Sequence, residues 1–451
     1  MSLDRERLAA LLVEEEHRFR ETHPRSLALF ARARRSLLGG VPMHWMVRWA
    51  GGFPLFVTGG EGAWVTDVDG RRYLDLCLGD TGAMTGHAPP ATVDAVRAQA
   101  GRGFTFMLPT EDAAWVGEEL ARRFGLPYWQ FAVTATDANR FALRLARAIT
   151  GRPKILVFNW CYHGTVDEAL VTLRDGTTVA RDGNLGPPVD PSLTSRVVEF
   201  NDVPALDAAL AHGDVACVLA EPALTNVGIV HPEPGFHAAL RELSRRAGAL
   251  LILDETHTIC AGPGGCTRAD GLDPDILTLG KPVAGGVPGA VYGLSEAVAE
   301  RVRARSPADT VDTAGIGGTL AANALATAAM RATLEHVLTE ASYRRSIFLA
   351  ERFARGVEGA IADARLPWIV KRLGCRVEYW FRAAPPRNGA EAAAAADPEL
   401  ERYMHLAALN RGILLTPFHN MALIAPAVTE QDVDRHTAVF RDIVRAGGLH
   451  R

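Results

Sequence analysis

Lysine is almost absent from this chain of 451 residues. Among its 48 basic side chains, the only lysines are Lys154, Lys281 and Lys371, and arginine occupies every other basic position. A guanidinium group stays protonated and cannot form an imine, so arginine cannot replace a lysine whose amine has to react. Lys154 and Lys371 lie in polar surroundings typical of surface charges, which leaves Lys281 as the candidate reactive amine.

The chain also lacks paired cysteines, long apolar runs and a large net charge. Its six cysteines include no C-x-x-C motif, which is typical of reduced thiols in a cytoplasmic protein rather than of a zinc site or a disulfide framework. No apolar run approaches the roughly 18 residues that cross a bilayer, and the charged N-terminus does not resemble a signal peptide. The net charge of −4 gives no reason to expect nucleic acid or membrane as a partner. We expect a soluble, cytoplasmic protein without a metal site.

Apolar and helical segments alternate from about residue 85 onward. The predicted strands lie at 129–133, 153–159, 215–220, 249–254, 275–279 and 289–294, with helices such as 137–150 and 234–247 between them. This alternation predicts an α/β fold, in which helices cover both faces of a mostly parallel sheet. Residues 85–320 form the predicted large domain. Residues 321–451 form a predicted smaller α+β domain, with strands at 375–381 and 413–416.

Residues 1–84 form a separate N-terminal segment in this division. Apolar positions at helical spacing predict helix within residues 5–37. Residues 63–76 are predicted to form a β-hairpin, with Asp69-Gly70 as a two-residue turn.

Lys281 lies at the end of one predicted strand, and Asp254 ends another strand 27 positions earlier in the chain. Ligands of mostly parallel sheets bind beyond the carboxyl ends of the strands, where both residues fall. The pair predicts a pyridoxal 5′-phosphate (PLP) site, in which Lys281 forms a Schiff base and Asp254 holds the pyridinium nitrogen. Lys281 is also the predicted proton carrier, because it lies beside the carbon that must lose a proton. For His163 and His257, a structural role is favoured over that of a general base.

Other residues at strand ends could complete this site. Thr134 and Thr136 lie between a strand and a helix, where N–H groups and hydroxyls can hold a phosphate, although a plain helix cap would also explain them. Tyr162 could stack on the cofactor ring or be a packed edge aromatic. Glu221 and Asn226 could hydrogen-bond the ring phenolate and nearby groups.

Several motifs occur together and in a fixed order. They are Gly86-His87, Tyr162-His-Gly164, Ala220-Glu-Pro222, Leu253-Asp-Glu255, Thr278-Leu-Gly-Lys281-Pro282 and Gly318-Thr319. By this set, almost the whole chain resembles the class III (omega-)aminotransferases of the fold type I PLP enzymes. Within them it is most similar to the glutamate-1-semialdehyde aminomutase-like subgroup.

The resemblance implies a PLP cofactor and a homodimer with shared sites. Ala135 and Thr136 would take the cofactor phosphate, Tyr162 would stack on the ring, and Asn226 would approach the ring oxygen. Thr319 would reach the phosphate in the neighbouring subunit. The further predicted cofactor contacts are Thr134, His163 and Glu221.

The departures from the family pattern concern the substrate. The usual Gly-Phe after the Asp-Glu motif is Ile259-Cys260, and the segment 41–49 is rich in tryptophan and methionine. By the resemblance, this segment and residues 80–84 belong with the small domain and roof the substrate pocket. The candidate substrate contacts are Trp45, Arg48, Thr81 and Arg376, with Arg48 preferred over Arg376 for a carboxylate.

The predicted function is that of an aminotransferase. A bulky or partly apolar amine or amino acid would give its nitrogen to the cofactor, which would pass it to a small keto acid such as pyruvate. An intramolecular aminomutase or an amino-acid racemase or epimerase would use the same residues and stays open as an alternative. A non-catalytic PLP-binding module is disfavoured, because the chain has no basic helix-turn-helix segment.

Overall fold

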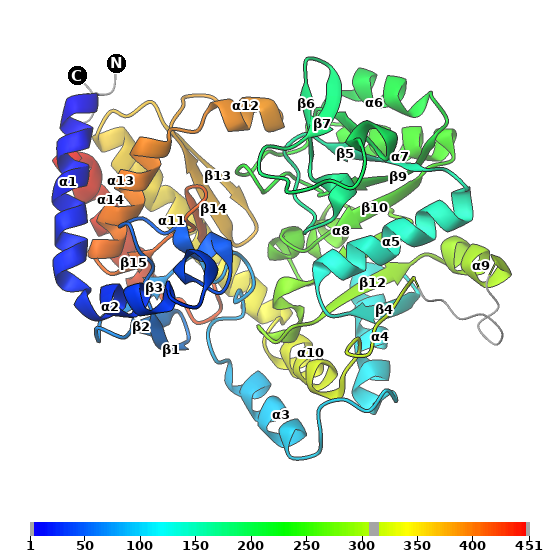
Figure 1. The fold of residues 1–451 in the computed structure, drawn as a ribbon, viewed down its shortest axis with the longest axis horizontal. Coiled ribbons are helices and arrows are strands. Elements are labelled where there is room, and N and C mark those ends of the chain that lie inside the picture. Colours follow the sequence, from blue (N-terminus) through cyan, green and yellow to red (C-terminus); the bar gives the residue numbers. More distant parts are fainter. Residues whose placement is uncertain (1–3, 306–314, 448–451) are drawn as a thin grey trace. The chain divides into compact units, whose positions relative to one another are not determined.

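The computed structural model describes residues 4–305 and 315–447 (Figure 1). The chain divides into two compact units. The terminal unit contains Met1–Pro89, Ala341–Pro385 and Ala395–Arg451, and the central unit contains Pro90–Glu340 and Pro386–Ala394. The sequence placed a boundary between residues 320 and 321, whereas α10 (Ala324–His336) belongs to the central unit because it packs against α3 (Pro90–Ala100) and α4 (Glu111–Phe124).

The central unit contains a seven-stranded sheet in the order β4-β12-β11-β10-β9-β5-β8. Its strands are β4 (Tyr128–Ala132), β5 (Lys154–Phe158), β8 (Ser195–Val198), β9 (Val215–Ala220), β10 (Leu250–Asp254), β11 (Ile276–Leu279) and β12 (Ala290–Leu294). The pairs from β8 through β11 are parallel, and β12 is antiparallel to both β11 and β4. The predicted α/β fold with a mostly parallel sheet is confirmed, although β8 was not predicted.

Burial on both faces explains the composition of the central strands. Every residue of β9 and β10 is buried, as expected for parallel strands covered by helices. Helix α5 (Ala135–Thr150) packs across β4, β9, β10, β11 and β12 with its apolar side. Figure 1 shows α6 (Val203–Leu210) and α7 (Phe236–Ala247) on the other side of these strands. The remaining elements of this unit are β6 (Val171–Arg174), β7 (Thr177–Ala180), α8 (Gly265–Ala269), α9 (Glu296–Arg305) and α12 (Gly389–Ala394).

The terminal unit combines helices with two small sheets. One sheet has the order β1-β2-β3-β15 and the other β13-β14-β16. The strands are β1 (Val57–Glu61), β2 (Trp64–Asp67), β3 (Arg72–Asp75), β13 (Ile369–Leu373), β14 (Arg376–Trp380), β15 (Ile413–Leu414) and β16 (Met421–Leu423). The helices are α1 (Arg5–Thr22), α2 (Pro24–Ala33), α11 (Glu340–Asp363), α13 (Pro398–Asn410) and α14 (Glu430–Gly447). A core that includes Phe19, Phe53 and Tyr73 joins α1 to the first sheet.

Two local predictions in this unit differ from the structure. The helical region 5–37 is broken between α1 and α2 at Pro24, whose ring cannot continue a helix. The hairpin turn is one residue longer than predicted. The Asp67 N–H donates to the Arg71 carbonyl at 3.0 Å, and this hydrogen bond closes a loop of three residues, 68–70. Gly70 has a φ of 85°, the left-handed conformation that glycine adopts readily in such loops.

All six cysteines are buried and none forms a disulfide. Within the described ranges, no helix has both the length and the apolar content needed to span a bilayer.

Candidate active site

The carboxyl ends of the central strands bring the predicted site residues to one edge of the sheet. Asp254 ends β10 and pairs with Thr278 of β11, and Lys281 follows Thr278 by three residues. The register of β9 with β10 places Glu221, the residue after β9, level with Asp254. The structure therefore assembles the acid and the amine that the sequence indicated, on neighbouring strands of one unit.

Lys281 has a strained backbone and a close neighbour. Its φ is 48°, an unfavourable value for a residue other than glycine and one that is often found at functional sites. A Cβ on the preceding Gly280 would lie 2.8 Å from the Cβ of Ala135, so only glycine fits between this turn and α5. Lys281 Nζ lies 2.7 Å from His257 Nε2. Sequence reasoning gave His257 a structural role and did not anticipate this contact.

Asp254 is buried and held by several donors. Its Oδ2 accepts hydrogen bonds from His163 Nδ1 at 2.9 Å and Asn139 Nδ2 at 2.8 Å, and its Oδ1 accepts one from the Thr256 N–H at 3.0 Å. Burial by itself raises the pKa of this carboxyl, but the hydrogen bond to His163 and the charge of His163 outweigh it and lower the pKa to about 2. Asp254 is therefore a buried carboxylate that stays charged.

His163 is the charged partner of this carboxylate. Burial lowers its pKa, whereas the Cys161 sulfur and the Asp254 carboxylate raise it, and the net result is a pKa of about 10. The imidazole is completely buried and its Nε2 has no hydrogen-bond partner in the described parts of the chain. His163 thus contacts the acid through Nδ1.

Asn139 is a site residue that sequence reasoning missed. It is buried on α5, where its amide donates to Asp254 and to the His163 carbonyl at 3.1 Å and accepts from the Thr278 hydroxyl at 2.7 Å. It therefore links α5, β10, β11 and the segment after β5. The available signal was one buried asparagine among the alanines and leucines of the helix face.

The N-terminus of α5 lies beside the Lys281 turn. Thr134 caps this helix: its hydroxyl accepts from the Asp137 N–H and donates to the Asp137 carboxylate. The Thr136 hydroxyl accepts from the Thr165 N–H at 3.1 Å. The Thr136 hydroxyl keeps its proton for donation, and the first backbone N–H groups of the helix, on Ala135 and Thr136, are further donors for an anion.

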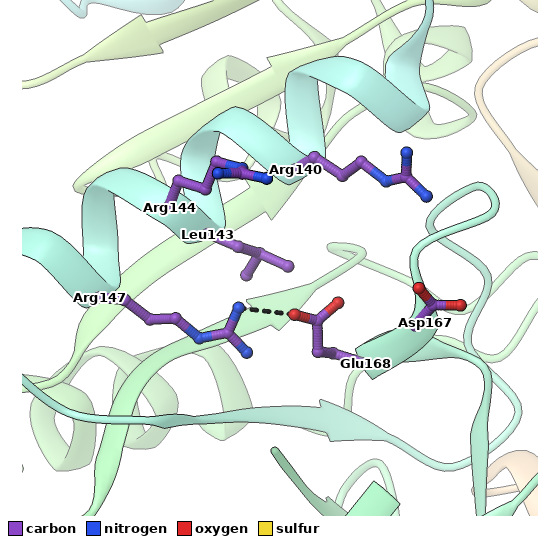
Figure 2. Close-up of a pocket in the computed structure, with 6 residues that line it drawn as sticks. All are labelled: Arg140, Leu143, Arg144, Arg147, Asp167 and Glu168. Atoms are coloured by element: carbon purple, nitrogen blue, oxygen red, sulfur yellow. Dashed lines mark hydrogen bonds and ion pairs between the residues drawn. The ribbon is translucent and has the colours of Figure 1, made fainter. Parts of the chain in front are cut away.

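Arginines on α5 anchor the segment that carries Tyr162 and His163. Figure 2 shows Arg140, Arg144 and Arg147 along one side of the helix, facing Asp167 and Glu168 across a pocket of about 570 Å³. Arg147 forms an ion pair with Glu168 at 2.6 Å, and Arg140 donates to the Thr165 carbonyl at 2.9 Å. These contacts fix the segment after β5 to α5.

The other predicted cofactor contacts differ in burial and in their partners. Tyr162 is half-buried, and Asn226 Nδ2 donates to the carbonyl of neighbouring Trp160 at 2.9 Å. Glu221 is buried and accepts from the Thr225 hydroxyl. Thr319 is exposed.

The predicted substrate contacts all lie in the terminal unit. The ring of Trp45 packs edge-on against Phe418 at 5.7 Å, and the Arg48 guanidinium lies 5.3 Å from the centre of the same ring. Thr81 and Arg376 have no exposed surface. A separate, mainly apolar pocket of about 670 Å³ lies in this unit, and Met46 and Trp49 contribute to it.

A lysine amine and a buried carboxylate beside a helix N-terminus, at the carboxyl edge of a mostly parallel sheet, define a PLP-dependent enzyme of fold type I. Residues 46–444 match the family model described as Aminotransferase class-III. The chain belongs to the class III aminotransferase family, and its cofactor is PLP.

Its relatives include several aminomutases. The chain is 38% identical to a glutamate-1-semialdehyde 2,1-aminomutase of Sorangium cellulosum, over 94% of this chain and 97% of that protein. It is 53% identical to a glutamate-1-semialdehyde aminomutase of Pseudomonas aeruginosa PAO1, a variant of which was solved in complex with PMP; the match covers 99% of this chain and 100% of that one, with a TM-score of 0.97. An omega-transaminase of Sphaerobacter thermophilus is 28% identical, over 94% and 97% of the two chains, with a TM-score of 0.85.

The candidate site fits this cofactor. Asp254 keeps its charge despite burial, as a carboxylate facing a pyridinium nitrogen must. The N-terminus of α5 offers N–H groups to a phosphate. Gly280 and Gly164 both lie where a Cβ would collide with α5, so the backbone approaches this helix closely.

Proposed function

We propose that the protein is an aminomutase, which moves an amino group between two carbons of one substrate. Sequence analysis favoured transfer between two substrates and kept this alternative open. The observation that carries the proposal is the 53% identity to the Pseudomonas aminomutase over nearly the whole chain. The relative from Sorangium cellulosum is also named as an aminomutase.

The proposed substrate is an amino aldehyde of the kind that these relatives are named for. A 2,1-aminomutase that acts on glutamate 1-semialdehyde moves nitrogen from C2 to C1 and yields 5-amino-4-oxopentanoate. Substrate and product are isomers, so the reaction needs no second substrate.

The proposed roles follow from the contacts of each residue. Bound PLP supplies an electron-accepting ring that stabilises negative charge at the carbon next to the substrate nitrogen. Asp254 would hold the ring nitrogen in its protonated form, and His163 and Asn139 would keep this carboxylate charged and oriented. Lys281 would carry the cofactor at rest and move the substrate proton once its amine is released.

The remaining proposed contacts position the cofactor. The N–H groups of Ala135 and Thr136 would bind its phosphate at the helix N-terminus, with Thr134 shaping the cap. Tyr162 would stack on the ring. Glu221 and Asn226, which both follow β9 in the chain, would lie near the ring oxygen.

A second candidate function is amino transfer between two substrates. The similarity to the omega-transaminase supports it, at 28% identity and therefore more weakly than the aminomutase similarities. Both functions use the same cofactor residues. They differ only in whether a keto acid is required.

The discriminating experiment supplies glutamate 1-semialdehyde to the enzyme without any keto acid and follows the product by NMR. We expect 5-amino-4-oxopentanoate with wild type and none with Lys281→Ala. A single amine donor with pyruvate is tested in parallel. Conversion that occurs only when pyruvate is present would replace the mutase by an aminotransferase.

The cofactor lysine can be mapped independently of any substrate. Borohydride reduction of the loaded enzyme should fix the cofactor to Lys281, and peptide mass spectrometry should find it there. A label on Lys154 or Lys371 would contradict the proposed site.

The proposed binding of a substrate carboxylate is tested by substituting two arginines. Arg48→Ala should raise KM for substrates that carry a carboxylate and leave KM for simple amines unchanged, because the side chain is exposed. Arg376→Ala is the comparison, with thermal unfolding measured alongside since this arginine is fully buried. Unchanged KM in both variants would reject both residues, and Trp45 and Thr81 would be tested next.

We also propose a homodimer in which Thr319 serves the partner's site. Exposed apolar side chains cluster at Phe104, Phe106, Met107 and Leu108, and the Phe104 carbonyl accepts from the Leu325 N–H at 3.4 Å, close in sequence to Thr319. An exposed apolar cluster of this kind favours contact with another chain.

Subunits of Lys281→Ala and Thr319→Ala, denatured and refolded together, should regain activity, because a mixed dimer would contain one intact site. If dimers of mixed composition regain no activity, Thr319 belongs to the site of its own subunit.

A further inference from the structure

His257 lies against the amine on which the proposed chemistry depends. Its Nε2 is 2.7 Å from Lys281 Nζ, although 24 positions separate the two residues. The register of the strands explains the contact. Asp254 pairs with Thr278, and the chain continues for three residues from each of them, to His257 and to Lys281.

The backbone at His257 is held by its neighbours. Glu255, two residues earlier, is fully buried and accepts from the Thr258 hydroxyl at 2.5 Å and from the N–H and hydroxyl of Thr267 at 2.5 and 2.6 Å. A Cβ on Gly265 would collide with the same carboxylate, so this turn is tightly packed. His257 is 8% exposed, and the tight packing of this turn holds its imidazole beside Lys281.

The amine and the imidazole cannot both be protonated at this distance. Two cations in contact repel each other, and an amine ordinarily binds a proton more tightly than an imidazole does. Whenever Lys281 carries the extra proton, its ammonium can donate to His257 Nε2, provided that the imidazole has its own proton on Nδ1.

The other ionisable groups at this edge have their own partners. Asp254 and His163 bind each other, and Glu255 is held by the hydroxyls, with its pKa raised by burial. Glu221, after β9, accepts from the Thr225 hydroxyl.

We propose that His257 is the proton relay of Lys281. When Lys281 is an ammonium, an N–H bond breaks at Nζ and one forms at His257 Nε2, which leaves a neutral amine and an imidazolium. The reverse transfer restores the pair, and no electrons are exchanged. His257 thereby returns Lys281 to the neutral amine between proton transfers and passes the proton on toward solvent. This inference rests on the proposed role of Lys281 as the amine that moves the substrate proton.

The first test measures the amine itself and needs no substrate. In enzyme loaded with pyridoxamine 5′-phosphate, Lys281 keeps a free amine, and trace acylation with acetic anhydride is measured at each pH by peptide mass spectrometry. His257→Leu removes the acceptor of the ammonium, so the pH of half-labelling at Lys281 should fall by about one to two units. His257→Gln keeps an acceptor oxygen and should shift it less.

The chain provides its own controls for this measurement. Lys154, which lies 3.4 Å from Asp214, and Lys371 are labelled in the same sample and should not change in either variant. An unchanged or raised half-labelling pH at Lys281 in both variants would overturn the relay.

The second test follows the route of the proton. An accepted amine donor is incubated with the loaded enzyme in D₂O, and deuterium uptake at its Cα is compared with return of the original proton. In His257→Gln, which cannot change its protonation state, the ratio of uptake to return should fall at least about threefold, because Lys281 is still present but exchanges slowly. A slower enzyme with an unchanged ratio would mean that His257 only supports the structure.

Both measurements are independent of the overall reaction. Neither measurement depends on which product is formed, so failure of the aminomutase proposal would leave these results interpretable. Circular dichroism and thermal unfolding establish that each variant is folded, and Gln, which preserves a polar side chain, serves if Leu is not tolerated.

Discussion

Replacing Asp254 by asparagine separates the charge of this side chain from its shape. The carboxylate accepts hydrogen bonds from His163, Asn139 and the Thr256 N–H. An amide of the same size has only one acceptor oxygen, so its NH₂ group must face at least one of these donors. One unpaired buried donor costs about 1–3 kcal/mol, which is the expected loss in the free energy of unfolding.

The catalytic loss should exceed this structural effect. Without the charge, the ring nitrogen of the cofactor is no longer held protonated, and the carbon that loses its proton is less stabilised. We expect kcat/KM to fall by well over tenfold, which corresponds to more than about 1.4 kcal/mol of barrier. The assay combines steady-state kinetics at saturating PLP with urea unfolding of the same preparation.

Asp275→Asn is a matched control on the neighbouring strand. This carboxylate accepts from the Leu251 N–H at 2.7 Å and from Arg241 at 2.9 Å, but it precedes β11 and therefore lies at the opposite edge of the sheet from Lys281. The control should lose stability and keep its activity within about twofold, because it contacts no site residue. The reasoning is refuted if Asp254→Asn retains near-native turnover, or if Asp275→Asn loses as much.

Three further predictions concern the same edge of the sheet. Lys281→Ala should still bind PLP weakly but lose turnover by about three orders of magnitude or more, measured with substrate in excess. Gly164→Ala should weaken PLP binding at least about tenfold in a fluorescence titration, because φ is 83° there and a Cβ would overlap Thr136 Oγ1; Gly117→Ala, which meets nothing within 4 Å, should bind PLP normally. His163 has a pKa of about 10 in the folded state against an ordinary value of 6.5. Protonation of His163 therefore stabilises the folded protein fully below about pH 6.5, and this stabilisation is lost as the pH rises through about 10. The difference in unfolding free energy between wild type and His163→Gln should therefore shrink over that range, and a difference that stays constant would contradict the assignment.

The two central site residues were predictable because each follows an apolar strand. A strand buried on both faces has a clear signature in sequence, and its first polar residue marks the sheet edge. Asp254 is the first polar residue of its run, Lys281 is the first charged residue after β11, and their strands are neighbours in the sheet. The N-terminus of α5 was identifiable for a similar reason, since Thr134 caps the helix directly after β4.

The side-chain contacts around them were not predictable. Helical periodicity places Asn139 on the buried face of α5 but does not say which carboxylate it meets. The contact of His257 with Lys281 depends on the pairing of β10 with β11, and the linear spacing of 24 residues carries no information about that register. Likewise, β12 looks like its parallel neighbours in composition, although it runs antiparallel beside β4.

His257 lies three residues after Asp254, and Lys281 lies three residues after Thr278. These equal distances along the chain determine where the protein tolerates insertions and deletions. A residue inserted between Asp254 and His257 would change the position and direction of the imidazole relative to Lys281, because only this short turn joins His257 to the end of β10. The connection at Asp270 to Asp273 is largely exposed and lies outside both counted segments, so a change in its length would leave both of them intact. In proteins with this arrangement, insertions and deletions should therefore occur in exposed connections such as 270–273. The segments 254–257 and 278–281 should keep their number of residues.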